Sequence, residues 1–492
     1  MLKIPRRLRL RLHYILSLIF LLTSCVPSTP VAQISLLNST PTPGITPLPQ
    51  ETRPSYAPGE LVAYTVQSGD TMPALAHRFN TSIDEIRAAN PIIPLDVTTL
   101  PTGMPMDIPI YYLPLWGSQY QIIPNGAFVN GPSSVGFDIQ GFVDAYPGWL
   151  KDTKVYAGGA TRTGAELVDY VAINFSVSPR LLLALLEYQA GALTNPDKPK
   201  TDFHLGYKDA VGHRGLYLQL TWAANTLNNG YYGWRTGTLT EFEHDDGSLE
   251  RPDPWQNAAS VGIQYYLSRI MPKSAYDTAI SPAGLADTYR QLFGDPWAGE
   301  DELIPGLLEQ PDFLLPFPRG SVWTYTGGPH TGWGVGSPFA AVDFAPPSQV
   351  SGCFTPAEDE YSTAMAAGIV SRLDTGVVVL DLDMDANERT GWSLLYLHIA
   401  TDGRPALGTI LNAGDPVGYP SCEGGRTTGT HIHIARKYNG EWMMADSSLP
   451  FNMEGWIPHN GTDAYDGTLS RDGFIVTASP VSDMFSSVLA GE

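Results

Sequence analysis

The chain has 492 residues, of which 43% are hydrophobic, and this is enough for about three packed domains of roughly 100–200 residues each. Its 29 basic and 50 acidic side chains give a formal net charge of −21. An acidic surface repels phosphate, so the composition argues against nucleic acid as a partner.

Residues 1–24 have the features of an export signal. Basic residues crowd the start of the chain, and the apolar run from Tyr14 to Leu22 follows them. That run is shorter than the roughly 20 residues of a membrane-spanning helix, so it predicts the apolar part of a signal peptide. The sequence Leu-Thr-Ser-Cys that ends at Cys25 resembles the lipobox of bacterial lipoproteins, which implies a lipid anchor on Cys25. A plain secretory peptide with an incidental cysteine is the alternative.

A linker and a small module come next. Residues 25–60 are rich in Pro, Thr and Ser without apolar periodicity, which predicts an extended tether. Residues 61–110 contain Tyr-Thr-Val-Gln-Ser-Gly-Asp-Thr and then apolar residues at helical spacing, a strand–helix–helix–strand pattern that resembles a LysM module. The resemblance implies a βααβ fold that binds N-acetylglucosamine-containing glycan, here peptidoglycan, through Gly69, Asp70 and Thr71. Asp70 and Thr71 also suit the turn and N-cap of the first helix.

Residues 111–315 are predicted to be α-rich. Helical periodicity is clear over 164–175, 178–187, 215–224 and 258–271, with Ser178 as a cap and Pro179 in the first turn. The second and third of these segments resemble the lysozyme-like fold of soluble lytic transglycosylases.

The position of the catalytic acid departs from that family. In the transglycosylases the leucine-rich helix ends in Glu-Ser-Gly, and this Glu is the general acid. At the matching position this chain has Gln189-Ala190-Gly191. An amide cannot protonate a glycosidic oxygen. Glu187 lies two residues away, which turns it by about 200° to another helix face. We therefore expect a non-catalytic glycan-binding or spacing module, with cleavage through Glu187 as the alternative.

Residues 316–492 combine strand-like segments with a pair of histidines. The runs 368–372, 376–381 and 392–398 predict an antiparallel sheet, because apolar and β-branched residues alternate with Gly and Asp turns. In His431-Ile432-His433, strand alternation places both imidazoles on one side. Two converging histidines are typical of one metal ligand beside one proton-transfer group.

Three local patterns resemble zinc peptidases of the M23 family. They are Gly-Pro-His-Thr-Gly at His330 followed by Val-Asp-Phe at Asp343, Tyr-Leu-His-Ile at His398, and Gly-Thr-His-Ile-His ending at His433. LytM-type members have a His-x-x-x-Asp motif, but the residue four before Asp343 is Phe339. The first histidine instead lies thirteen residues before Asp343, a spacing that resembles the β-lytic branch.

The resemblance implies a role for each of these residues. His330, Asp343 and His433 are the expected ligands of Zn2+, and catalytic zinc leaves one further position for water. One of His398 and His431 is expected to transfer the proton and the other to stabilise the oxyanion. The sequence does not decide which histidine has which role.

Further residues are expected near this site. Tyr465 matches a β-lytic tyrosine that helps to hold the transition state. If Cys25 carries lipid, Cys353 and Cys422 remain as a pair in an oxidising compartment, and we expect a disulfide that braces the loop before the His-x-His strand. Two free buried thiols are the alternative. His459 is expected to be an ordinary loop residue.

Taken together, the sequence predicts an exported, lipid-anchored, multidomain α+β protein of the bacterial cell wall. A LysM module would bind peptidoglycan, an α-rich module would follow, and an antiparallel-sheet zinc endopeptidase would cut wall peptides. A non-catalytic scaffold that activates other hydrolases and a muramidase acting through the middle module are the competing hypotheses.

Overall fold

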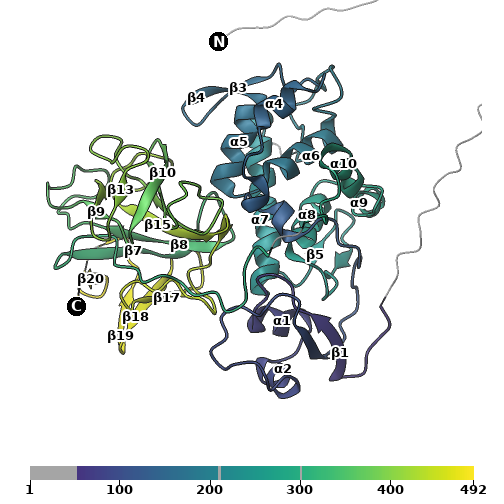
Figure 1. The fold of residues 1–492 in the computed structure, drawn as a ribbon, viewed down its shortest axis with the longest axis horizontal. Coiled ribbons are helices and arrows are strands. Elements are labelled where there is room, and N and C mark those ends of the chain that lie inside the picture. The colour runs from purple at the N-terminus through teal and green to yellow at the C-terminus, as the bar shows by residue number, and fades with distance from the viewer. Residues whose placement is uncertain (1–52, 209–211, 300–301, 482, 492) are drawn as a thin grey trace, which may run out of the picture. The chain divides into compact units, whose positions relative to one another are not determined.

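The computed structural model describes residues 53–208, 212–299, 302–481 and 483–491 (Figure 1). The predicted signal peptide, Cys25 and most of the predicted linker lie outside the described residues. The predicted fold class, α+β with a βααβ module and an antiparallel C-terminal sheet, is confirmed. Within the described ranges, no helix is both long and apolar enough to cross a bilayer.

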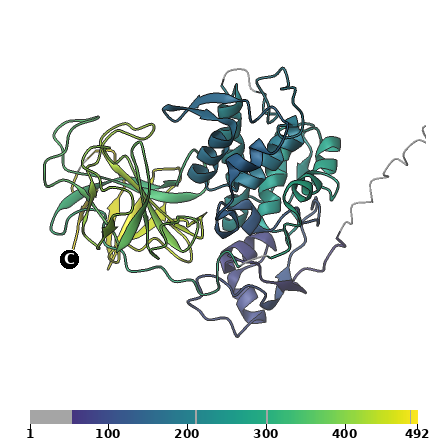
Figure 2. The same ribbon diagram turned by 45° about the horizontal axis from the view of Figure 1, so that its top comes forward.

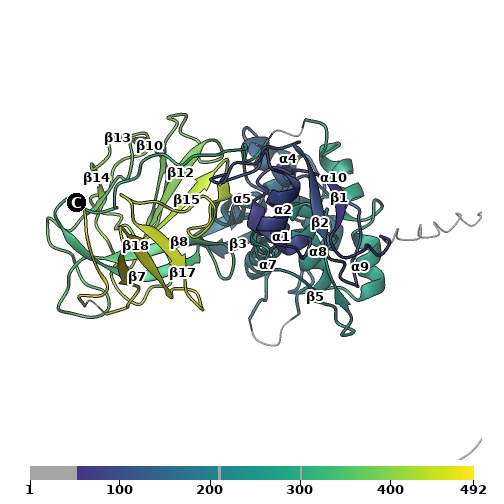
Figure 3. The ribbon, with the colours of Figure 1, turned by 90° about the horizontal axis from the view of Figure 1, so that it is seen from below.

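The first module has the predicted βααβ order (Figure 3). Thr71 caps the first helix, because its side chain accepts from the amide of Ala74, and Ser82 forms a capping box with Glu85 at the second. The elements are β1 (Glu60–Thr65), α1 (Met72–Arg78), α2 (Ile83–Ala89) and β2 (Pro105–Ile110), and the two strands pair antiparallel.

The middle module is α-rich, as Figure 2 shows, and it also contains two short hairpins. The helices α7 and α8 approach closely where two glycines meet: a Cβ on Gly230 would lie 2.8 Å from the Cα of Gly262. The helices are α3 (Asn125–Phe128), α4 (Ile139–Asp144), α5 (Gly164–Phe175), α6 (Pro179–Ala190), α7 (Leu216–Thr236), α8 (Ala258–Ser268), α9 (Lys273–Ala279) and α10 (Leu285–Phe293), and the hairpins are β3 (Lys154–Ala157) with β4 (Ala160–Thr163) and β5 (Phe242–Glu243) with β6 (Leu249–Glu250).

The predicted helices differ from the observed ones mainly at their ends. The helix α5 has the predicted bounds, whereas α7 runs to Thr236, twelve residues past the predicted end at Ala224. Polar residues after Ala224 break the apolar pattern, but burial of most of that segment in the module sustains the helix. Ser178 is the N-cap of α6, yet its side chain makes no capping hydrogen bond.

The C-terminal module is built on a nine-stranded sheet of order β13-β10-β11-β12-β15-β8-β7-β20, in which β16 pairs with β15. Every pairing in this sheet is antiparallel. Its strands are β7 (Val322–Thr331), β8 (Phe339–Ala345), β10 (Gly368–Asp374), β11 (Val377–Asp381), β12 (Trp392–Leu397), β13 (Ile410–Leu411), β15 (Ile432–Tyr438), β16 (Glu441–Trp442) and β20 (Ser487–Leu489).

Smaller sheets complete this module. His459, expected in a loop, lies instead in a strand, where its Nε2 is 2.7 Å from Ser470 Oγ. Nearby Asn-Gly favoured a turn, but pairing with β18, the next strand along the chain, extends the backbone there. The strands are β9 (Ser362–Thr363) with β14 (Pro416–Gly418), and β17 (Ile457–Asn460), β18 (Gly467–Arg471) and β19 (Phe474–Thr477).

The two faces of the large sheet belong to different cores. Residues such as Val378, Leu394 and Ile434 pack within the C-terminal module. On the opposite face, Leu395 and Ala435 pack in one continuous core with the helices of the middle module. The boundary predicted at residue 315 therefore separates two stretches of sequence but not two separate cores.

One arginine joins all three modules. Arg235, near the end of α7, is 4% exposed. It donates to the backbone oxygen of Ser68 in the first module, and its Nη2 donates to Tyr231 within its own helix. Its Nε lies 3.0 Å from Glu441 on β16. The charge is thus paired inside protein, at the point where the modules meet.

Candidate active site

Three potential metal ligands converge on the sheet face that also contacts the helices. His433 on β15 pairs directly with Asp343 on β8, and His330 lies near the end of the neighbouring β7. Asp343 Oδ1 is 3.3 Å from both His330 Nε2 and His433 Nδ1, and these nitrogens are 2.9 Å apart. All three residues are buried.

Backbone carbonyl groups orient both imidazoles. His330 Nδ1 lies 2.8 Å from Gly328 O, and His433 Nε2 lies 3.2 Å from Gly332 O. A carbonyl oxygen only accepts, so these ring nitrogens are the protonated ones in the neutral side chains. The other two nitrogens then present lone pairs toward Asp343, which is the tautomer that a metal-binding histidine needs.

This donor set suits zinc. Tetrahedral zinc with bonds of about 2.0–2.2 Å separates its ligand atoms by about 3.3 Å, close to the spacing of these three atoms. Two imidazole lone pairs and a carboxylate repel one another unless a cation lies between them. Asp343 Oδ1 is buried and accepts no hydrogen bond of good geometry. Burial raises the pKa of Asp343, but electrostatic interaction with His330 and His431 outweighs it and holds that pKa well below its ordinary value.

The other two predicted histidines lie beside the ligands. His398 Nδ1 is 2.7 Å from Glu423 O, and His431 Nδ1 is 2.8 Å from Gly429 O, so both rings turn Nε2 away from these carbonyl groups. Their ring centres are 4.6 Å apart, and His431 Nε2 is 3.7 Å from Asp343 Oδ2. Burial and the charge of His431 lower the pKa of His398 to about 4, which keeps this imidazole neutral near pH 7.

Tyr465 also reaches the site. Its ring stacks on that of His330 with centres 4.0 Å apart, and the side chain is 54% exposed. Its backbone oxygen accepts from the amide of Gly328, 2.7 Å away, which fixes the loop against the strand that carries His330. The phenol is therefore accessible from solvent.

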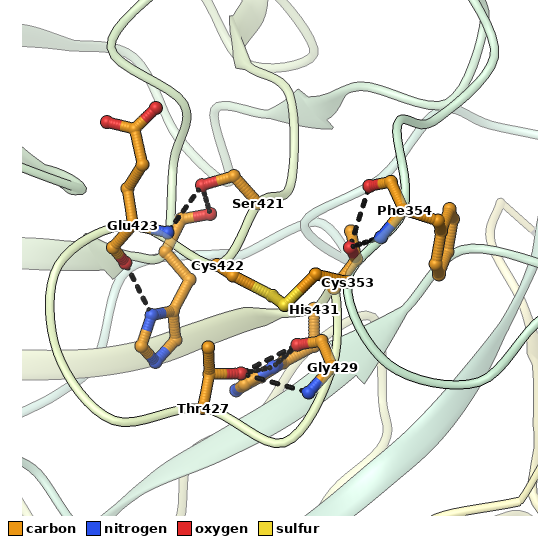
Figure 4. The surroundings of a disulfide bond; sticks show 10 residues. Cys353, Phe354, Ser421, Cys422, Glu423, Thr427, Gly429 and His431 are labelled. Carbon is orange, nitrogen blue, oxygen red and sulfur yellow. Dashed lines mark hydrogen bonds between the residues drawn. A yellow bond between two sulfur atoms is a disulfide. The ribbon is translucent and has the colours of Figure 1, made fainter.

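A disulfide joins two loops around the histidines (Figure 4). Cys353 and Cys422 are bonded, and Cys422 directly precedes Glu423, whose carbonyl oxygen orients His398. Further along the same loop, Thr427 Oγ1 lies 3.2 Å from His431 Nδ1. Glu423 and Thr427 were not predicted as positioning residues, because no local motif marks a backbone acceptor or a loop hydroxyl.

These side chains share one cleft of about 1270 Å³. It is lined by the three potential ligands, both further histidines, Tyr465 and the disulfide. Among the described residues of the middle module, none lines this cleft. The helices thus support the sheet without filling the space in front of the histidines.

The residues predicted to bind glycan have internal roles in this structure. Asp70 is 1% exposed, and its carboxylate accepts from Tyr64, Gln67 and Arg78. A Cβ on Gly69, whose φ is +78°, would lie 2.5 Å from Arg235 Nη1, and Thr71 caps α1. The charge of Asp70 is thus satisfied inside the module, and the binding of glycan by Gly69, Asp70 and Thr71 stays a prediction.

Glu187, the alternative candidate for a catalytic acid in the middle module, also has a structural role. Both backbone amides of Leu193 and Thr194 donate to Glu187 Oε2, so this carboxylate holds the turn that follows α6. Gln189 stands where the acid was expected, near the end of the same helix.

Comparison with known families divides the chain in the same way. A family model for the LysM domain matches residues 64–109, and a model described as the N-terminal domain of LasA matches residues 121–306. The middle module matches a LasA N-terminal domain. That match stands where a lytic-transglycosylase fold was expected from the leucine-rich helix.

Curated proteins are also similar to this chain. Protease LasA of Pseudomonas aeruginosa is 26% identical over 341 residues, which are 63% of this chain and 74% of that protein. Beta-lytic metalloendopeptidase of Achromobacter lyticus is 30% identical over 170 residues, 33% of this chain and 42% of that protein. The enzyme of the same name from Lysobacter enzymogenes is 29% identical and is covered to 88%.

Solved structures of peptidases are similar to part of the chain. Pseudoalterin, an M23 metalloprotease from the deep sea, is 23% identical over 34% of this chain and 96% of its own, with a TM-score of 0.29. The catalytic domain of lysostaphin from Staphylococcus simulans is 18% identical over 25% of this chain and 87% of its own, with a TM-score of 0.17.

Proposed function

We propose that the chain is an exported zinc metalloendopeptidase that hydrolyses peptide bonds of peptidoglycan. The observation that carries the proposal is the convergence of His330, Asp343 and His433 at 2.9–3.3 Å in a cleft that also holds two further histidines. The names of the curated relatives, a protease and two metalloendopeptidases, support the same reaction class.

The chemistry divides between the ion and the side chains. When bound, zinc polarises the scissile carbonyl group and lowers the pKa of water. His398 is neutral near pH 7, so its Nε2 accepts the proton of the attacking water and returns it to the leaving amine. The exposed phenol of Tyr465 donates to the oxygen that becomes negative in the transition state, and His431 would donate to it from Nε2 when both of its ring nitrogens carry a proton.

We further propose how the enzyme reaches its substrate. Lipid on Cys25 would anchor the protein on the extracytoplasmic face of the membrane, and residues 25–60 would span part of the distance to the wall. The LysM match supports binding to the glycan of peptidoglycan through the first module. Such binding would raise the local concentration of wall peptides near the cleft.

The test is release of new amino termini from purified peptidoglycan, with the muropeptides identified by mass spectrometry. We expect the parent chain to release them, and we expect both a chelator and His433→Ala to abolish release, because a two-ligand site holds zinc weakly. The matched control is His459→Gln, which changes a histidine outside the cleft and should retain release. Unchanged peptidoglycan with the zinc-loaded parent would favour the non-catalytic scaffold.

A muramidase activity of the middle module is the second candidate. Its expected product is new reducing ends, and it would depend on Glu187. Because this carboxylate already accepts two backbone amides, we expect no reducing ends from either the parent or Glu187→Gln. Reducing ends that disappear in Glu187→Gln alone would establish the muramidase.

A further inference from the structure

Three aspartates gather in the turn between β11 and β12, away from the histidines. They are Asp381, Asp383 and Asp385, and one carboxylate oxygen of each lies within 4.8 Å of those of the other two. A Cβ on Gly391, whose φ is +56°, would lie 2.2 Å from Asp383 Oδ2, so the end of the turn closes tightly around that carboxylate.

The innermost aspartate is incompletely satisfied. Asp381 is 0% exposed; its Oδ2 accepts from the amide of Ala386, but its Oδ1 has no hydrogen-bond partner. Burial and the neighbouring Asp383 raise the pKa of Asp381 to about 7. A buried carboxylate oxygen with no donor is costly unless a cation or a proton satisfies it.

Protein cations near this turn are already paired elsewhere. Arg372 and Lys437 both form ion pairs with Glu388. In the described part of the chain, no Lys, Arg or His forms an ion pair with any of the three aspartates. The charge in the turn therefore lacks a protein counter-ion.

We propose that this turn is a calcium site whose ligands include Asp381, Asp383 and Asp385. Calcium takes oxygen ligands at about 2.3–2.6 Å, so oxygens up to about 5 Å apart can share one ion. Magnesium needs a tighter octahedral shell at about 2.0–2.1 Å and is the weaker candidate. The site is separate from the proposed catalytic centre. Val377 on β11 pairs with Leu397, which in turn pairs with His433. Asp381 lies four residues further along β11 than Val377, which is roughly 13 Å at about 3.3 Å per residue.

The turn connects the sheet to the helices. Just beyond the aspartates, Arg389 Nε donates to Asn130 Oδ1 in the middle module, and Arg389 lies 3.7 Å from Asp169 on α5. Calcium would relieve repulsion between the carboxylates and hold the turn in the conformation that makes these contacts. The ion would thus stabilise the attachment of the middle module to the sheet.

The test titrates the full, zinc-loaded chain with CaCl2 by isothermal titration calorimetry in calcium-free buffer. We expect one saturable site with Kd on the order of 10⁻⁴–10⁻³ M, as in other extracellular calcium modules, and at least tenfold weaker binding of MgCl2. Asp383→Asn/Asp385→Asn should abolish that site, because it removes the charges of two proposed ligands. Both changes keep the shape of exposed side chains. Asp402→Asn/Asp472→Asn, which changes two exposed aspartates elsewhere, should bind as the parent does.

Thermal unfolding separates a calcium site from a merely structural turn. Saturating CaCl2 should raise the Tm of the parent by a few degrees and leave the Tm of Asp383→Asn/Asp385→Asn unchanged. Either no saturable calcium binding by the parent or equal binding by the variant would overturn the proposal.

Discussion

Glu388 holds a buried negative charge between two cations. It is 5% exposed and forms ion pairs with Arg372 and Lys437. The distance from Lys437 Nζ to Glu388 Oε2 is 3.1 Å. Burial opposes ionisation, but the charges of Arg372 and Lys437 outweigh it and lower the pKa of Glu388 from 4.5 to about 2. The ion cluster also reaches the middle module, because Arg372 donates to Asn174.

This pKa predicts a pH dependence of stability. A carboxylate with a lowered folded pKa stabilises the fold above its unfolded pKa, so the contribution is complete above pH 4.5 and is lost as the pH falls toward 2. The shift corresponds to about 3 kcal/mol. We expect Glu388→Gln to lose about this free energy of unfolding at pH 7 and to show a smaller difference from the parent at pH 2, measured by urea unfolding across that range.

The control for this measurement is Glu358→Gln, which removes an exposed carboxylate from the same module. Its unfolding free energy should follow that of the parent at every pH. A constant deficit of Glu388→Gln between pH 7 and pH 2 would contradict the titration and indicate lost packing instead.

Single residues also show what a sequence can predict. His330, Asp343, His398 and His433 each sit in a short local pattern, so their chemistry could be predicted before their positions were known. Asp70 belongs to such a pattern as well, but the same Gly-Asp-Thr also builds a turn, and the structure uses its carboxylate there. A local pattern predicts the chemistry of a residue, whereas the structure shows which contacts its side chain makes.

At the scale of elements, the end of α7 links the first module to the last. Arg235 donates to Ser68 and pairs with Glu441, which lies 206 residues further along the chain. No local pattern connects these positions, so the contact could not be predicted from the sequence. Beside it, Ser68 Oγ accepts from the amide of Ile304 at 2.8 Å, which adds a second tie to the same loop.

This junction predicts a large effect of one substitution. Arg235→Met leaves Glu441 buried without its counter-charge, and we expect a loss of roughly 3–5 kcal/mol in the free energy of unfolding. The double variant Arg235→Met/Glu441→Gln should recover part of it, because the unpaired charge is gone. Hydrogen exchange at the amides of residues 67–70 should quicken in the single variant, since the loop loses its donor.

An exposed arginine provides the comparison. Arg290→Met breaks an ion pair with Asp287 on α10, where the arginine side chain is 46% exposed, and should cost less than about 1 kcal/mol. Equal losses from the two arginine substitutions would show that the Arg235 junction carries no special stabilisation.

At the scale of the whole molecule, one sheet face serves two purposes. Along β15 and β8, the pair His433–Asp343 is followed two residues later by the pair Ala435–Ala341, which packs against the helices. The strands and the expected ligands could be predicted from local sequence. The sharing of this face could not, because it depends on which module covers the sheet. Strand alternation places His433 and Ala435 on one side but does not identify the covering partner.

The shared core predicts the behaviour of a truncated chain. Residues 316–492 alone would expose Leu395, Trp442 and Met443, which are buried in the shared core. We therefore expect this fragment to bind a hydrophobic dye and to self-associate, whereas residues 111–492 should remain monomeric, as measured by size-exclusion chromatography with light scattering. A monomeric fragment that does not bind the dye would show that the sheet face is stable without the helices.

The long segment between His330 and Asp343 has a consequence for how such proteins recombine. Its amides at Val335 and Ser337 donate to Asn225 and Asn229 of α7. A gene fusion could join the C-terminal module of another such protein after residue 315. All residues of its candidate site would be kept, yet Asn225 and Asn229 would face a loop of another length. Successful exchange of the peptidase therefore requires that the donor bring the matching helix or that the loop and α7 change together.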